Sequence, residues 1–276
     1  MISQDLRYAV RTLLANAGFT ATAVICLSLG IGLNSAIFSV VDAVLLQPFP
    51  YPDADRIVVV NSTNQRAGVM RGGVSWLDLR DLREETRTIA SMAAFTGRTL
   101  TIADGISEPE RFNGAVVSST LFALLGTPPA LGRDFRADED RVGAERVVML
   151  SDDVWRRRYN ADRSIIGRAI TVNALPHTVI GVMPPGFMFP ETQRLWVTIA
   201  PYFETTARDL RVLQVFARLK PGVSIDQAAA DLNATAARLV AAYPKENEGW
   251  GAAVRPLADW MIPGSVPDVC ASSGNC

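Results

Sequence analysis

Residues 19–41 read FTATAVICLSLGIGLNSAIFSVV, an uncharged run in which eleven residues are Leu, Ile, Val or Phe. As a helix that rises about 1.5 Å per residue, this run is roughly 34 Å long, enough to cross a hydrocarbon core of about 30 Å. We therefore predict one transmembrane helix near the N-terminus. A cleaved signal peptide is the alternative, but its apolar core is only about 7–15 residues long and is followed by small residues. Here the run continues into DAVLL at 42–46.

The charges on either side of this run predict its orientation. Arg7 and Arg11 precede it, and three aspartates follow it before the next basic residue, Arg56. Because positive flanks stay in the cytoplasm, we predict a cytoplasmic N-terminus in a bacterial inner membrane, with the main domain outside the cytoplasm. Residues 1–17 would then be a cytoplasmic amphipathic segment, and residues 18–46 would hold the transmembrane helix. The amphipathic segment fits a helix lying on the membrane surface or a plain extension of the span.

Small residues recur along one side of the predicted span. Ser28, Gly32 and Ala36 are spaced by four residues, and Asn34 adds an amide. Small side chains let a second helix approach closely, and an amide in lipid favours a hydrogen-bonding partner. We predict that Ser28, Gly32, Asn34 and Ala36 form a helix-packing face. The alternative is that lipid merely tolerates small residues there.

The remaining sequence mixes helical and strand patterns without regular alternation, which predicts an α+β fold. The S-x-x-D sequence at 75–78 and the S-x-x-Q sequence at 224–227 predict helix starts. The first helix is predicted to keep its apolar face as far as Ala90, and the second to bury Tyr243. Ser119 is predicted to cap a short helix over residues 121–125. Apolar or alternating runs predict strands at 56–61, 93–103, 111–117, 147–150, 168–173, 177–182, 195–199, 212–219 and 252–256.

Three charged features are typical of ordinary structural positions. The arginine run at 156–158 falls near the end of a predicted helix, where it complements the helix dipole, so we predict a solvated helix terminus rather than an anion site. The carboxylates at 138–140 and 152–153 are predicted to lie in solvated turns and caps, since no EF-hand spacing is present. The single histidine, His177, is predicted to be a half-buried or exposed strand residue rather than a catalytic base.

Signatures of several other functions are missing from the sequence. The 276 residues include 27 Lys and Arg and 28 Asp and Glu, so no excess of basic charge points to nucleic acid. There is no G-x-x-x-x-G-K-[ST], G-x-S-x-G or H-E-x-x-H sequence, and one histidine is too few for a multi-histidine metal site. We therefore predict no enzyme activity, no metal and no cofactor. The three cysteines lie at positions 26, 270 and 276, so the middle of the chain has none. This excludes a disulfide framework in the main domain.

Several short motifs together resemble one family. Near the N-terminus these are LRYA at 6–9, GFT at 18–20, LGIG at 29–32 and NSAIFSVV at 34–41. Later motifs are PALGRDF at 129–135, WRRRY at 155–159, VIGVMPPGF at 179–187 and ARLKPGV at 217–223. In their number, order and spacing they resemble the MacB-like (FtsX-like) permeases of ABC transporters, over residues 3–262.

The resemblance implies a domain layout and a set of partners. Residues 47–258 would form a MacB-like periplasmic core domain, with a flanking lobe from about 47–105 and 205–258 and an inserted lobe from about 106–204. The implied role is a permease component of an ABC-type transporter or mechanotransmission complex, without catalytic residues. The implied partners are a cytoplasmic ABC ATPase, membrane lipid, and other transmembrane helices or a second permease copy.

The C-terminal sequence departs from the family pattern. The family continues into further transmembrane helices, whereas residues 259–276 form a short irregular tail that carries Cys270 and Cys276. We hypothesise a truncated permease. The alternative, which the residues support without the resemblance, is a single-pass membrane-anchored periplasmic binding or scaffolding module without transport activity.

Overall fold

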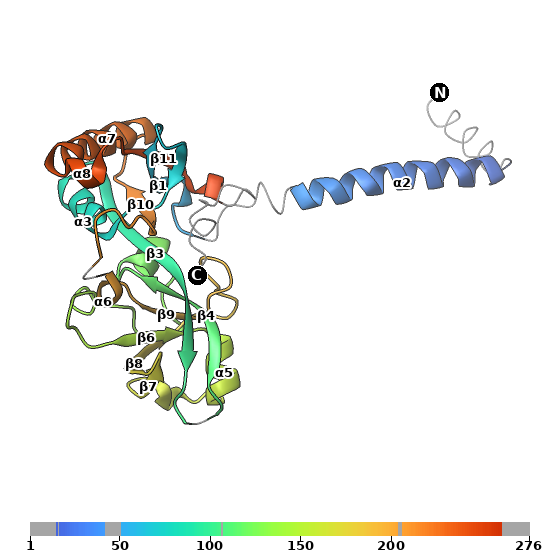
Figure 1. The fold of residues 1–276 in the computed structure, drawn as a ribbon. Helices are drawn as coiled ribbons and strands as arrows, with labels where there is room; N and C mark the ends of the chain where they lie inside the picture. The colour runs from blue at the N-terminus through green and yellow to red at the C-terminus, as the bar shows by residue number, and fades with distance from the viewer. Residues whose placement is uncertain (1–14, 16, 42–50, 106, 204–205, 261–276) are drawn as a thin grey trace. The chain divides into compact units, whose positions relative to one another are not determined.

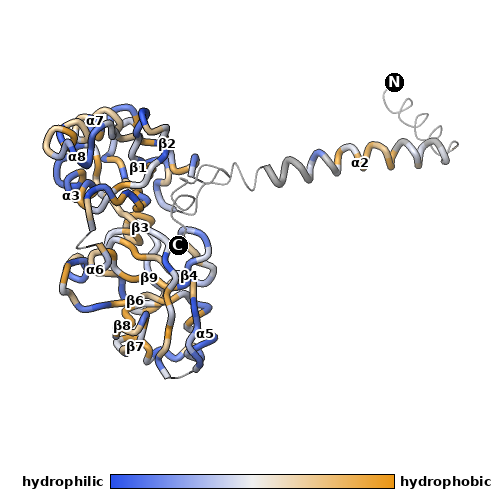
Figure 2. The backbone as a smooth tube through the Cα atoms, in the orientation of Figure 1, coloured by the Kyte–Doolittle hydropathy of each residue, from blue (hydrophilic) through white to orange (hydrophobic). Residues whose placement is uncertain are grey.

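A computed structural model describes residues 15, 17–41, 51–105, 107–203 and 206–260. The chain divides into two compact units, Met1–Pro50 and Tyr51–Cys276. The first unit contains helix α2, Ala17–Val41, where Figure 2 marks apolar residues along the helix. Over the described part of the chain, no helix combines the length and the apolarity needed to cross a membrane. The predicted amphipathic segment and the predicted C-terminal tail lie almost entirely outside the described residues.

The second unit is built around an 11-stranded sheet with the order β11-β1-β10-β3-β4-β9-β6-β8-β5. β2 pairs with β1, and β7 pairs with both β3 and β8. The pairs β4–β9 and β6–β8 are parallel, and the other pairs are antiparallel. The strands are β1 (Ile57–Asn64), β2 (Val69–Gly72), β3 (Ile89–Ile102), β4 (Glu110–Val117), β5 (Leu131–Gly132), β6 (Val147–Leu150), β7 (Ala169–Val172), β8 (Leu175–Val182), β9 (Leu195–Thr198), β10 (Gln214–Leu219) and β11 (Gly251–Pro256).

Two groups of elements share this sheet (Figure 1). The flanking group contains β1, β2, β10 and β11 with helices α3 (Trp76–Glu85), α7 (Ile225–Ala242) and α8 (Pro244–Asn247). The inserted group contains β4 to β9 with helices α4 (Leu121–Leu125), α5 (Asp152–Tyr159) and α6 (Ala200–Phe203). This is a mixed fold of helices with one large sheet, in agreement with the predicted α+β class. The residue boundaries of the two lobes stay a prediction.

Strand β3 joins the two groups and runs from one to the other in Figure 1. From Ile89 to Phe95 it pairs with β10, and from Phe95 to Ile102 it pairs with β4. Phe95 therefore lies where β3 changes its partner, opposite Gln214 on one side and Val117 on the other.

The predicted caps determine where two helices begin. The Ser75 hydroxyl accepts a hydrogen bond from the Asp78 amide at 3.1 Å. The Ser224 hydroxyl accepts from the Gln227 amide at 3.2 Å, and the Gln227 side chain accepts from the Ser224 amide at 2.9 Å, which completes a capping box. These bonds satisfy amides that a helix N-terminus leaves unpaired.

Three local predictions are wrong. Helix α3 ends before Thr86 instead of continuing to Ala90, because Thr86 is extended (φ −79°, ψ 138°) and its amide and hydroxyl both donate to a carbonyl of the last helical turn. Thr120 rather than Ser119 precedes α4, and it makes no side-chain capping bond. Tyr243 is 39% exposed at the end of α7 instead of buried.

Alternate residues of the central strands face different layers. Ala94 of β3 and Val215 of β10 belong to the apolar core that includes Leu79 of α3 and Leu232 of α7. Phe95 is the next residue along β3, and because successive strand side chains point to opposite faces, it faces away from these helices. Figure 2 shows apolar residues along the strands of both groups.

Candidate functional site

An aromatic cluster covers the sheet face that Phe95 occupies. Its rings contact one another in a continuous set, and most of them are buried. They come from both groups of elements and from both ends of the described part of the second unit. The members are Tyr51, Phe95, Phe122, Phe135, Phe187, Phe189, Trp196, Phe216 and Trp260.

Phe95 is one of the rings at the centre of the aromatic cluster. Its ring centroid lies 5.0 Å from that of Phe189, 5.2 Å from that of Phe216 and 5.9 Å from that of Trp260, all in edge-to-face geometry. Each such pair contributes about 0.5–1.5 kcal/mol beyond the area it buries. The Trp196 indole also donates to the Phe189 carbonyl at 2.8 Å, which fastens the loop before β9 to that strand.

The aromatic cluster ties both ends of the described domain to this centre. Tyr51 is the first residue of the second unit, and its ring lies 6.5 Å from that of Phe189. Trp260 is the last described residue and packs on Phe95 and Phe216. Ring contacts therefore link both ends of the described domain to Phe95, where β3 passes from the flanking group to the inserted group.

A buried ionic network lies on the helix side of the sheet. The Asp78 carboxylate accepts hydrogen bonds from Arg208 at 2.7 Å, from Asn247 at 3.1 Å and from Arg211, and Arg208 also binds Asp81 at 2.7 Å. The side chains of Asp78, Arg208 and Arg211 are 7%, 9% and 6% exposed. Burial acts to raise the pKa of Asp78, but the hydrogen bonds from Arg211 and Asn247 and the charge of Arg211 lower it below its usual value. The network joins α3 to α8 and to the segment that enters β10.

Both arginines of the ionic network also stack on aromatic rings. The Arg208 guanidinium lies 3.7 Å from the Tyr243 ring centroid, and that of Arg211 lies 4.3 Å from the Trp250 centroid. Such contacts favour a desolvated cation, and they explain why Tyr243 stays at the surface as a cover for Arg208. The sequence marked Asp78 only as a position in a helix cap. Its partner Arg208 is 130 residues away, so no local pattern could have revealed it.

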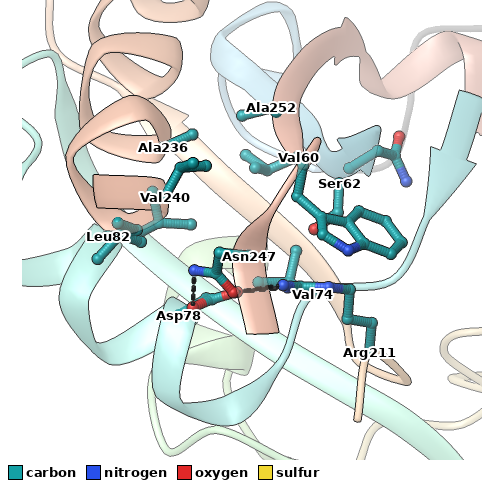
Figure 3. Close-up of a pocket in the computed structure, with 14 residues that line it drawn as sticks. Val60, Ser62, Val74, Asp78, Leu82, Arg211, Ala236, Val240, Asn247 and Ala252 are labelled. Atoms are coloured by element: carbon teal, nitrogen blue, oxygen red, sulfur yellow. Dashed lines mark hydrogen bonds and ion pairs between the residues drawn. The ribbon is translucent and has the colours of Figure 1, made fainter. Parts of the chain in front are cut away.

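A small cavity lies beside the ionic network (Figure 3). Asp78, Arg211 and Asn247 line it together with apolar residues such as Val60 and Val240. Its volume is about 30 Å³, which is the space of about one water molecule. Small-molecule sites are typically about 300–1,000 Å³. The cavity therefore belongs to the structural network and is not a ligand site.

The arginine run at 156–158 is not uniformly solvated. The side chains of Arg156 and Arg157 are 58% and 57% exposed, but that of Arg158 is 3% exposed and binds Asp104 at 2.7 Å. The Tyr159 hydroxyl also donates to Asp104, at 2.5 Å. The prediction of a solvated helix terminus is therefore wrong for Arg158, because the connection between β3 and β4 brings a buried carboxylate onto α5.

The carboxylates at 138–140 are also more structured than predicted. Glu139 is 9% exposed and accepts from the Arg133 guanidinium at 2.9 Å. Asp140 accepts from the backbone amides of Ser119 at 3.0 Å and Ala200 at 3.1 Å. For these two residues the solvated-turn prediction is wrong, because their loop packs against α4 and α6. Within the described ranges, no three His, Cys, Asp or Glu side chains gather closely enough to hold a metal ion.

His177 is buried in β8, with 2% exposure, so the prediction of a half-buried or exposed residue is wrong. Its Nδ1 lies 3.0 Å from the Leu175 carbonyl oxygen. Burial lowers the pKa of His177, although that carbonyl opposes the shift. In the part of the chain that the structure describes, the imidazole contacts no carboxylate or hydroxyl through a hydrogen bond, so the geometry shows a core histidine.

The predicted helix-packing face falls on α2. Ser28, Gly32 and Asn34 are exposed there, and the side chain of Ala36 lies outside the described residues. At about 100° per residue, Ser28 and Gly32 lie about 40° apart around the helix, but Asn34 lies about 200° from Gly32. The amide therefore points away from the small residues. The packing role of this face stays a prediction.

One family of known proteins matches most of the chain. The sequence profile of the MacB-like periplasmic core domain matches residues 20–235. The chain belongs to this family. A search of curated proteins finds no match to it.

Solved structures share the fold of this MacB-like chain. A domain of a proposed permease protein from Porphyromonas gingivalis matches with a TM-score of 0.56 and 14% identity, covering 76% of this chain and 92% of that one. The periplasmic region of MacB from Actinobacillus actinomycetemcomitans matches with a TM-score of 0.54 and 15% identity, covering 75% and 91%. The extracellular domain of the noncanonic ABC-type transporter YknZ from Gram-positive bacteria matches with a TM-score of 0.50 and 14% identity, covering 72% and 99%.

Proposed function

We propose that this MacB-like chain is the permease component of an ABC-type transporter or mechanotransmission complex, in which a cytoplasmic ATPase moves the periplasmic domain. The aromatic cluster is the observation that supports this role. Tyr51 and Trp260 lie where the chain enters and leaves the described domain, and ring contacts connect both to Phe95. In this proposal, the packed rings carry movement from these two points to the strand that joins the two groups.

The proposal includes a membrane-spanning helix within residues 18–46, a cytoplasmic N-terminus and a periplasmic domain. The uncharged run at 19–41 and the arginines before it support this arrangement. Alkaline carbonate extraction of cell membranes tests it. We expect the full chain to stay in the pellet and a chain of residues 51–276 to be released. Release of the full chain would contradict the proposed insertion.

Purification of the tagged full chain from native membranes in detergent tests the ATPase partnership. We expect magnesium-dependent ATP hydrolysis to co-purify with the full chain, which has no phosphate-binding loop of its own. The chain of residues 51–276 is the control and should elute without this activity. Elution of the full chain without ATP hydrolysis would favour the second candidate, a membrane-anchored periplasmic binding module without transport activity. A ligand-sized cleft between the two groups of elements supports that second candidate.

A further inference from the structure

A cleft lies between the flanking group and the inserted group of elements. Its volume is about 410 Å³, within the range of small-molecule sites. The end of α3, the start of β3 and the loops that precede α4 and β6 line it. Arg83 and Asp140 are its charged lining residues, and Ser91 and Ser119 add hydroxyl groups. Its walls come from both the flanking group and the inserted group.

Arg83 is an incompletely paired cation. Its Nη2 donates to the Met92 carbonyl at 3.1 Å and to the Ser118 hydroxyl at 2.7 Å. Its Nε is buried and has no hydrogen-bond partner among the described residues. Burial lowers the pKa of Arg83, and the charge of Asp140 partly offsets that shift. An anionic group in the cleft would stabilise this guanidinium through its charge, without reaching the buried Nε.

Asp140 is an anion that interacts with Arg83 without touching it. The charges of the two side chains affect each other, yet within the described residues no ion pair of 4.0 Å or less joins them. The Asp140 carboxylate is held by the backbone amides of Ser119 and Ala200. Each carboxylate oxygen has a second lone pair, so Asp140 can accept one more donor. A cation and an anion separated by a gap match a ligand that carries both charges.

We propose that this cleft binds a small zwitterion of amino-acid or dipeptide size, with the ligand carboxylate on Arg83 and the ligand ammonium on Asp140. The hydroxyl groups of Ser91 and Ser119 provide neutral hydrogen-bonding partners. Because Arg83 belongs to the flanking group and Asp140 to the inserted group, a bound ligand connects the two groups across their boundary. Binding therefore resists relative movement of the two groups, whatever drives that movement.

Calorimetric titration of the full chain with the dipeptide Ala-Ala tests the proposal. N-acetyl-Ala-Ala lacks the ammonium group and Ala-Ala-amide lacks the carboxylate, so each blocked form loses one charged contact. A hydrogen bond to a charged group contributes about 1.5–3 kcal/mol, which corresponds to a loss of affinity of about tenfold or more. We expect saturable binding of Ala-Ala and about tenfold weaker binding of each blocked form.

Two variants locate the binding. Arg83→Met should weaken Ala-Ala binding about tenfold and should no longer distinguish Ala-Ala from Ala-Ala-amide. Arg87→Met is the matched control, since Arg87 is exposed and does not line the cleft, and it should bind like the unmodified chain. A melting curve confirms that each variant is folded. The proposal is overturned if the unmodified chain shows no saturable binding, if the blocked forms bind equally well, or if Arg83→Met binds undiminished. None of these outcomes depends on ATPase co-purification.

Discussion

The two faces of the sheet are held by opposite kinds of contact. On the helix side, the carboxylate of Asp78 holds Arg208 and Arg211 through directional bonds between buried charges. On the other side, Phe95 and its neighbours make edge-to-face ring contacts, each of which is individually weak. The buried charges therefore hold the flanking group through a few strong bonds, whereas the rings join the two groups through several smaller contributions.

The largest expected effect comes from removing the centre of the ionic network. Asp78→Ala leaves buried Arg211 without its carboxylate partner and leaves Arg208 with Asp81 alone, which costs about 3–5 kcal/mol of unfolding free energy. Urea unfolding of the full chain, followed by tryptophan fluorescence, measures this loss. Asp209→Ala is the control, because Asp209 is exposed beside Arg208, and it should change stability by less than about 0.5 kcal/mol. Equal effects of the two substitutions would show that the network does not stabilise the flanking group.

The second-largest expected effect comes from a substitution in the aromatic cluster. Phe95→Leu keeps an apolar side chain but removes three edge-to-face pairs, which at about 0.5–1.5 kcal/mol each should cost about 1.5–4.5 kcal/mol. Phe112→Leu is the matched control, since Phe112 is 5% exposed and is not a member of the aromatic cluster. It should cost less than about 1.5 kcal/mol in the same unfolding measurement. If the control costs as much as Phe95→Leu, the ring contacts add nothing beyond burial.

The two regions should also respond to pH in opposite directions. Asp134 precedes Phe135 of the aromatic cluster, and burial raises its pKa to about 6, whereas the pKa of Asp78 is lowered. Because folded Asp134 holds a proton more tightly than the unfolded chain does, the unfolding free energy should rise as the pH falls from about 6 to about 4. Below about pH 4, unfolded Asp78 takes up a proton that folded Asp78 does not bind, so the unfolding free energy should fall again.

Urea unfolding between pH 3 and pH 7 measures this profile. Each group can contribute a slope of at most about 1.4 kcal/mol per pH unit. Asp134→Asn should flatten the profile between about pH 4 and pH 6, and Asp78→Ala should flatten it below about pH 4. An Asp134→Asn profile that matches that of the unmodified chain would contradict the assignment of the upper transition to Asp134.

The smallest expected effect comes from an exposed ion pair. It tests whether the ionic network stabilises the fold because its charges are buried, rather than because they are charged. Glu85 and Arg238 join α3 to α7 with an ion pair of 2.8 Å whose side chains are 39% and 55% exposed. Glu85→Gln should cost less than about 1 kcal/mol, and the difference should shrink in high salt because solvent ions screen exposed charges. A cost close to that of Asp78→Ala would break the distinction between buried and exposed pairs.

Local sequence patterns predicted most elements of the fold. The capping box at Ser224 and the alternating strands depend on residues a few positions apart, so their signals are contained in short windows. The errors occur where distant segments meet. Helix α3 stops where Asp231, more than 140 residues later, accepts the backbone amides of Arg87 and Thr88. Arg158 is buried because Asp104, 54 residues earlier, folds onto it.

The sequence by itself determined the α+β class, the helix starts and the family resemblance, because these depend on residue types and spacings along the chain. Only the tertiary structure decided that β3 changes its partner at Phe95, and that Arg83 and Asp140 line one cleft. Strand register and the packing of loops depend on the simultaneous fit of segments that are far apart in sequence. No window of neighbouring residues contains that information.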